Sequence, residues 1–183
     1  MKPWLVTALL AAGGVSAVAA PAPRAPTVPG KPAVALTRPA AGVVNLSVTP
    51  ATISFDASNP DFMPTVSASE PVSVTWRSFD RNPGIWSLSV QAGTGAFDNC
   101  RNIPISAIIV SCTSTFTNSS KSGACRPPFS LSASPQVAAS GKQGLATFSY
   151  SVTLTLALSD DWKYIAQTNP PCSLSLTYIA TVP

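Results

Sequence analysis

Apolar and polar positions alternate in two stretches near the end of the chain. Between Phe148 and Leu158 every even-numbered residue is apolar, and four of the five odd-numbered ones are Ser or Thr. From Cys172 to Val182 the even-numbered positions are again apolar, with Ser, Thr or Ile between them. A period of two is typical of antiparallel strands that have one buried face and one wet face. These stretches therefore predict two amphipathic strands over a core.

Shorter segments upstream repeat this pattern between clusters of Gly, Pro, Asn and Asp. The segments 44–48, 72–76 and 86–90 alternate, and Trp76 and Trp86 share the phase of the core positions. The nearly continuous apolar run 105–110 predicts a central strand buried on both faces, with Pro104 at its start. The polar segment 113–128 is expected to be a long loop. This spacing predicts a single all-β domain, an antiparallel β-sandwich over 43–183.

The N-terminus has the features of an export signal. Lys2 precedes a short apolar run from Trp4 to Leu10, and Ala17-Val18-Ala19 forms an A-x-A site. This arrangement predicts a signal peptide over 1–19, with cleavage before Ala20. The apolar run is too short to span a membrane. We therefore expect a secreted protein, either extracellular or periplasmic or held at the cell surface, with no transmembrane segment after cleavage.

The segment 20–42 differs in composition from the rest. It holds six prolines and almost no large apolar residues. Proline removes a backbone donor and fixes φ, so we expect neither helix nor sheet ladder here. A disordered Pro/Ala-rich tail is the simpler interpretation, and an extended spacer that holds the domain away from a surface is the alternative.

Net charge does not indicate a nucleic-acid partner. The 183 residues carry a formal charge of +4, but four of the 11 Lys and Arg residues lie before Val43. The other seven balance seven acids, so the predicted domain is neutral. A nucleic-acid partner requires a basic surface on the fold itself. The sequence predicts none.

Four cysteines in an exported chain predict two disulfides. A metal site is the alternative, but it requires closely spaced pairs or histidines, and the chain has no histidine. Three pairings are possible. We favour Cys112 with Cys125, which closes the polar loop onto a strand end, and Cys100 with Cys172.

Catalytic chemistry has little support in this sequence. Without histidine, the most common general base and metal ligand are missing. The adjacent acids Asp160 and Asp161 lie between two predicted strands, where Asp favours a turn, and they are a poor catalytic dyad. We therefore predict a protein that is not an enzyme and that needs neither cofactor nor metal.

Trp162 and Tyr164 are the candidate ligand-binding aromatics. They are two residues apart, so on a regular strand they would share a face and could stack on sugar rings. Asp160 and Asp161 beside them could accept hydrogen bonds from hydroxyl groups. The alternative is that both rings continue the buried parity of Leu156 and Leu158.

Two segments resemble a known family of bacterial surface domains. Trp86-Ser87-Leu88 and the run from Tyr150 to Asp160 look like the two signature segments of WxL-type domains, although Leu156 stands where that family has tryptophan. The resemblance implies an exported β-rich domain held non-covalently at the cell wall. The layout also resembles fimbrial and other Ig-like surface proteins.

These observations favour a non-enzymatic structural or adhesive module of the cell surface or envelope, with an Ig-like sandwich fold. Its partners would be cell-wall or other glycans, or other surface proteins. The first alternative is a carbohydrate-binding module that uses Trp162 and Tyr164. The second is a pilus-like subunit that assembles by strand addition. Against the second, the tail is rich in proline, which is poorly suited to a donor strand.

Overall fold

The computed structural model describes most of the predicted domain and a short N-terminal segment. The structure describes only the backbone, and not the side chains, of residues 4–9, 43, 44, 57 and 148. The predicted tail 20–42 and positions 10–19 of the predicted signal peptide lie outside the described residues, which are 4–9, 43–57, 59–78, 83–117, 123–143, 148–164 and 171–183.

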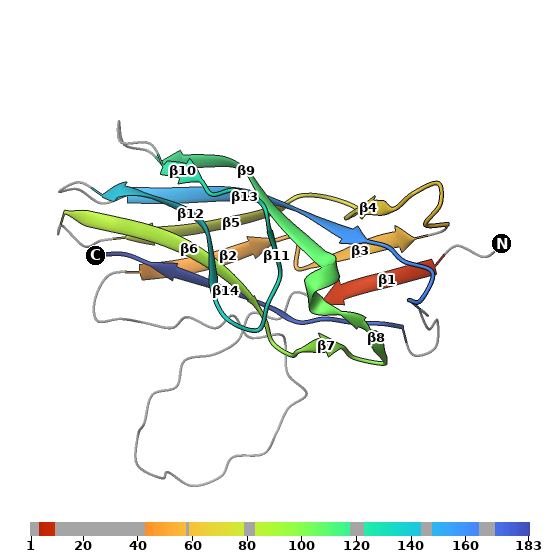
Figure 1. Ribbon diagram of the computed structural model, residues 1–183. Helices are drawn as coiled ribbons and strands as arrows, with labels where there is room; N and C mark the ends of the chain where they lie inside the picture. The colour runs from red at the N-terminus through yellow and green to blue at the C-terminus, as the bar shows by residue number, and fades with distance from the viewer. Residues whose placement is uncertain are drawn as a thin grey trace, which may run out of the picture.

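The larger sheet contains the longest strands of the chain (Figure 1). All its pairings are antiparallel, and β13 lies at its centre, paired with β9 on one side and with β5 and β4 on the other. Its strands, in spatial order, are β11 (Phe129–Ser130), β9 (Ile108–Thr117), β13 (Phe148–Ser159), β5 (Val72–Ser78) and β2 (Val43–Thr49), with β4 (Thr65–Ser67) beside the end of β13.

The second sheet has four strands and is also antiparallel. Its order is β10 (Gly123–Cys125), β12 (Gln136–Gln143), β6 (Gly84–Ala92) and β14 (Leu176–Thr181). Two further pairs complete the fold: β7 (Ala96–Phe97) with β8 (Cys100–Pro104), and β1 (Trp4–Leu9) with β3 (Thr52–Ala57). The fold is thus all-β, as the alternation predicted.

Aromatic side chains join the buried faces of the two sheets. Trp76 on β5 and Tyr150 on β13 are stacked with ring centroids 5.1 Å apart. Trp86, on β6 of the smaller sheet, meets Trp76 edge-on at 5.7 Å and Tyr150 at 5.3 Å. Aromatic pairs in such geometries contribute beyond the area they bury. The three rings therefore stabilise the contact between the sheets, and Trp76 and Trp86 are core residues as predicted.

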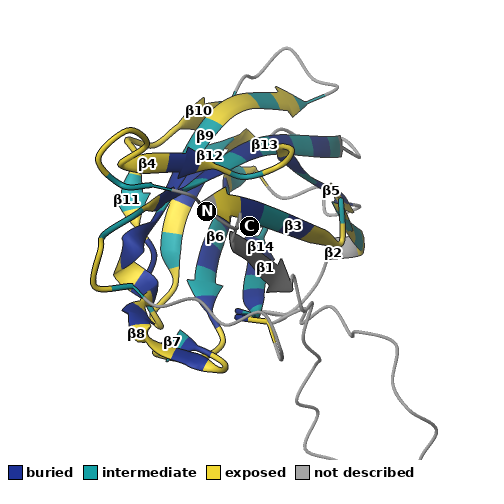
Figure 2. Ribbon diagram, turned by 90° about the vertical axis from the view of Figure 1, so that its right-hand side faces the viewer, coloured by how far each residue is buried: buried dark blue, intermediate teal, exposed yellow. Residues whose placement is uncertain are grey.

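The predicted alternation is visible along the long strands (Figure 2). On β13 the described even-numbered positions from 150 to 158 are buried, and the odd-numbered ones up to 157 are only half-buried. On β14 Leu176, Tyr178 and Ala180 are buried in the same way. One face of each strand therefore contributes to the core, and the other faces outward.

Two disulfides connect different parts of the fold. Cys112 on β9 is bonded to Cys125 on β10, so this bond links the two sheets. Cys100 on β8 is bonded to Cys172, which lies four residues before β14. These are the two pairs favoured from the sequence. Cys100 and Cys172 are buried, whereas Cys125 is exposed.

Two local predictions were wrong. The apolar run 105–110 is not one strand, because Ile105–Ala107 form a short 3₁₀ turn and β9 begins only at Ile108. Pro104 ends β8 and precedes this turn instead of starting a strand. The segment 113–128 is not all loop either, since β9 continues to Thr117 and β10 lies within it. Pairing with neighbouring strands determines where these elements begin and end, and a local sequence pattern does not show that pairing.

Candidate functional site

Two loops come together where β3 and β4 meet the end of β13. The first covers 59–64 and the second 160–164. The backbone N–H of Asp160 donates to the carbonyl oxygen of Pro64 at 2.9 Å, which ties the loops together. We call the two loops the tip.

The first loop is built around Asn59. Its carbonyl oxygen accepts hydrogen bonds from the N–H groups of Phe62, at 3.1 Å, and Met63, at 2.8 Å. Its side-chain oxygen accepts from the N–H of Asp61 at 2.9 Å. Asn commonly organises a turn in this way, by bonding backbone two residues ahead. The turn leaves Phe62 84% exposed and Met63 45% exposed.

Trp162 links the two loops through its side chain. The indole Nε1–H donates to Oδ1 of Asp61 at 3.0 Å, and the side chain is 63% exposed. The hydrogen bond restricts how the ring can turn while its apolar surface stays open to solvent. Phe62, Met63 and Trp162 therefore give the tip three exposed apolar side chains.

The second loop is a tight turn stabilised by Asp161. Its carbonyl oxygen accepts from the N–H of Tyr164 at 2.9 Å, and its carboxylate accepts from the N–H of Lys163 at 3.1 Å. The ammonium of Lys163 lies 2.8 Å from the same carboxylate and 5.4 Å from the centre of the Tyr164 ring. The hydrogen bond from the Lys163 side chain is the main reason that the pKa of Asp161 lies below its ordinary value.

The four candidate residues named from the sequence lie in this turn but do not form the expected platform. No strand continues past Ser159, so Trp162 and Tyr164 do not share a strand face. Tyr164 packs against the core, whereas Trp162 points outward. The alternative that both rings are buried was wrong for Trp162. Asp160 and Asp161 stabilise the turn, as their position between strands suggested: the Asp160 carboxylate accepts from the N–H of Asp161 at 2.9 Å.

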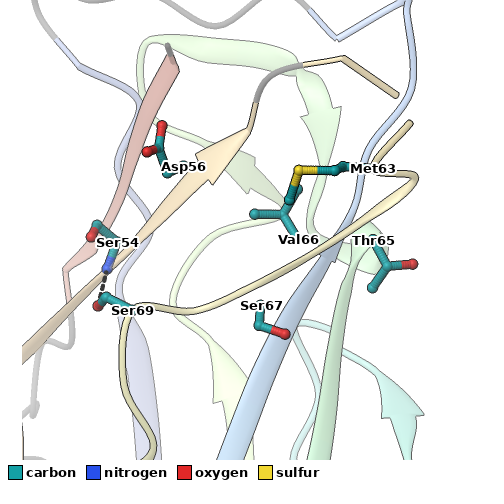
Figure 3. A pocket seen from close by; sticks show the side chains of 7 residues that line it. All are labelled: Ser54, Asp56, Met63, Thr65, Val66, Ser67 and Ser69. Atoms are coloured by element: carbon teal, nitrogen blue, oxygen red, sulfur yellow. Dashed lines mark hydrogen bonds between the residues drawn. The ribbon is translucent and has the colours of Figure 1, made fainter. Parts of the chain in front are cut away.

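A hollow of about 510 Å³ lies beside the tip (Figure 3). Met63 lies on one side of it, and Asp56 near the end of β3 is the one charged residue among the described residues that line it. The remaining lining side chains are small or hydroxyl-bearing: Ser54, Thr65, Val66, Ser67 and Ser69. The hollow is thus a mixed apolar and polar surface continuous with the exposed Met63.

Asp61, Phe62 and Met63 were missed from the sequence. The only signal was the turn-forming run Asn59-Pro60-Asp61, which predicts a loop but not the exposure of the residues after it. Phe62 and Met63 are apolar and would ordinarily be assigned to a core. Their exposure follows from the turn around Asn59, and only the hydrogen bond from Trp162 to Asp61, 101 positions away, joins this turn to the second loop.

Within the described ranges, no three His, Cys, Asp or Glu side chains lie close enough together to hold a metal ion. The same part of the chain contains no helix with the length and apolar character needed to cross a membrane. Comparison with known proteins found no matching family model, no matching curated protein and no matching solved structure.

Proposed function

We propose that this chain is an exported, non-enzymatic structural or adhesive module of the cell surface, and that the tip is its contact surface. The observation that carries the proposal is the exposed but hydrogen-bonded Trp162 beside Phe62 and Met63. Exposed apolar groups gathered in one place are typical of interaction sites. Aromatic anchors held in position before binding lose little conformational entropy when a partner arrives.

The two disulfides support the export part of this proposal. Disulfides persist mainly in oxidising compartments such as the periplasm and the extracellular space. They also suit a surface module, because they limit unfolding where no reducing repair is available. The bond between Cys112 and Cys125 joins the two sheets directly.

A second candidate function is glycan binding at the same tip. Trp162 offers a flat ring face, and Asp61, to which its indole is bonded, could accept hydrogen bonds from sugar hydroxyls. This glycan site would consist of Trp162 and Asp61, and not of Trp162 and Tyr164 as predicted from the sequence. A protein partner would also contact Phe62 and Met63, which are apolar and exposed.

The test compares Trp162→Ala and Phe62→Ala with a matched control. Phe116→Ala is the control, because Phe116 is also 63% exposed but lies on β9. Binding of the mature protein to native cell envelopes would be measured before and after the envelopes are treated with protease. We expect both tip variants to bind about tenfold more weakly or worse, in the range of aromatic hot spots, with the control unchanged.

The treatments separate the two functions. Binding that is lost after protease treatment, and that needs Phe62, indicates a protein partner. Binding that survives protease, needs Trp162 and is matched by purified cell-wall polysaccharide indicates a glycan. Equal binding by the native protein and both tip variants would contradict the proposal.

A further inference from the structure

The N-terminal strand covers an edge of the fold. All six residues of β1 pair with β3 in antiparallel register, from Trp4 opposite Ala57 to Leu9 opposite Thr52. On its other side β3 is tied to the chain beyond β4, through a bridge between Phe55 and Ala68. Figure 1 shows β1 beside β3, and within the described residues β1 pairs with no other strand. β1 is therefore what closes this edge.

β1 also lies entirely within the segment predicted to be removed on export. If cleavage occurs before Ala20, the mature chain keeps β3 but loses β1. Ile53 and Phe55, which are 2% and 0% exposed in the structure that includes β1, would then lie on an edge strand. Six positions of β3 would also lose their backbone partners on that side. Such an open edge readily pairs with another chain.

We propose that the edge of β3 in the mature protein is an acceptor site for a strand from a second copy of the chain, and that the incoming strand is the segment 33–38. The proposal rests on the export proposed above but not on the binding role of the tip. The segment, Ala-Val-Ala-Leu-Thr-Arg, is the longest proline-free run between residues 20 and 42. It has the same length as β1, so the high proline content of the tail does not prevent pairing here.

The segment can pair with β3 in the register that β1 has in the structure. If Val34 takes the position of Val6 opposite Phe55, Leu36 takes the position of Ala8 opposite Ile53. Directly opposite residues of an antiparallel pair share a face. The two largest apolar residues of the segment then fall on the face of the buried Ile53 and Phe55. In this register 33–37 lie opposite 56–52, Pro32 falls opposite Ala57 at the end of the ladder, and Arg38 extends past Thr52.

The length of the connection favours a second copy over the same chain. In this register residue 37 lies opposite Thr52, and only six residue steps join it to Val43, with a reach of at most about 20 Å. β2 and β3 follow one another end to end (Figure 1). The seven residues of β2 already span about 20 Å, and the turn at 50–51 adds to the separation of Val43 from Thr52. The connection is therefore too short for the segment 33–38 to pair with β3 of the same chain.

The experiment uses oxidised mature protein beginning at Ala20. We expect light scattering after size exclusion to show assemblies that grow with concentration. Leu36→Pro removes a ladder donor and should leave monomers, whereas Thr27→Pro, outside the segment, should assemble like the parent. A synthetic peptide of residues 4–9 should bind the Leu36→Pro monomer one to one and should block assembly of the parent.

Successive N–H groups of a strand point to opposite sides, and the N–H of Ser54 donates to Oγ of Ser69 on the side away from β1. Amide hydrogen exchange of Ile53, Phe55 and Ala57 therefore gives an independent measurement. These amides should exchange slowly in the assembly, quickly in the Leu36→Pro monomer, and slowly again with the peptide. A mature chain that stays monomeric would overturn the proposal, as would assembly that is unaffected by Leu36→Pro or an exported protein that retains residues 4–9. Trp162→Ala should assemble normally, so failure at the tip and failure at β3 are distinguishable.

Discussion

The indole ring of Trp86 covers Gly141, the residue directly opposite it on the neighbouring strand β12. A Cβ atom at position 141 would lie 2.8 Å from both Cε2 and Nε1 of Trp86. Gly123 on β10 is paired with Gly141 in the same row, and the same ring lies against it. Two glycines in neighbouring strands thus leave room for the indole ring of Trp86.

The first prediction follows from this contact. Gly141→Ala should destabilise the protein by about 1–3 kcal/mol, because the methyl group would overpack both the Cα of Gly123, 2.7 Å away, and the Trp86 ring. Urea unfolding monitored by tryptophan fluorescence would measure it. Gly95→Ala is the control, since nothing lies within 4 Å of a Cβ there, and it should change stability by less than about 0.5 kcal/mol. Equal effects of the two substitutions would contradict the packing described.

The second prediction concerns the two faces of β13. Leu154 is fully buried, and Thr153 on the opposite face is half-buried and lies between Ser73 and Ser114 of the adjacent strands. Leu154→Asp should prevent folding, because it places an unpaired charge in the core. Thr153→Asp should leave a folded protein. Circular dichroism and thermal unfolding would distinguish them, and comparable loss of folding in both would mean that β13 is buried on two sides.

The third prediction concerns alkaline pH. Burial raises the pKa of Tyr150 to about 12 and raises that of Tyr178 above its ordinary value. Because the unfolded tyrosines ionise near pH 10, their contribution to stability is complete below pH 10 and is lost as pH rises toward the folded pKa. The free energy of unfolding should therefore fall above about pH 10.

Two tyrosine variants test the origin of this fall. In Tyr178→Phe and Tyr150→Phe the decline of stability with pH above about 10 should be less steep than in the parent. Tyr150→Phe also removes the 2.7 Å hydrogen bond from its hydroxyl to Oε1 of Gln143, so it should lower stability at neutral pH by about 1 kcal/mol. If the pH profiles of both variants matched that of the parent, these tyrosines would not be the groups responsible.

The fourth prediction distinguishes the two disulfides. Cys125 is exposed and Cys112 half-buried, whereas Cys100 and Cys172 are both buried. A mild reductant should therefore open the bond between Cys112 and Cys125 first, while the fold is intact. Mass mapping of alkylated peptides at increasing reductant would show the order. If the Cys100–Cys172 bond opened first, burial would not be what protects it from the reductant.

Removal of each disulfide should cost a different amount. The bonds span 13 and 72 residues of sequence. By loop-closure entropy the shorter contributes about 3 kcal/mol and the longer about 4 kcal/mol. Replacing each pair by serine and comparing unfolding midpoints would test this order.

The sequence predicted strand alternation better than it predicted loops. The parity of Leu154, Leu156 and Tyr178 has one physical cause, a sheet with one buried face, so local pattern was sufficient. The short turn at Ile105–Ala107 was missed, because a continuous apolar run does not distinguish a strand from another buried segment. The tip was only half predicted. Trp162 was named, but its partner Asp61 is distant in sequence, and a side-chain hydrogen bond between two loops leaves no periodic signal.

Export to the cell surface is the claim on which the proposed function and the acceptor edge both rest. It is tested most directly by fractionating native cells into cytoplasm, membrane, wall and medium, and by determining the N-terminal sequence of the protein where it accumulates. We predict a chain that begins near Ala20 and is found in the envelope or the medium. A chain that retains Met1 and accumulates in the cytoplasm would contradict it.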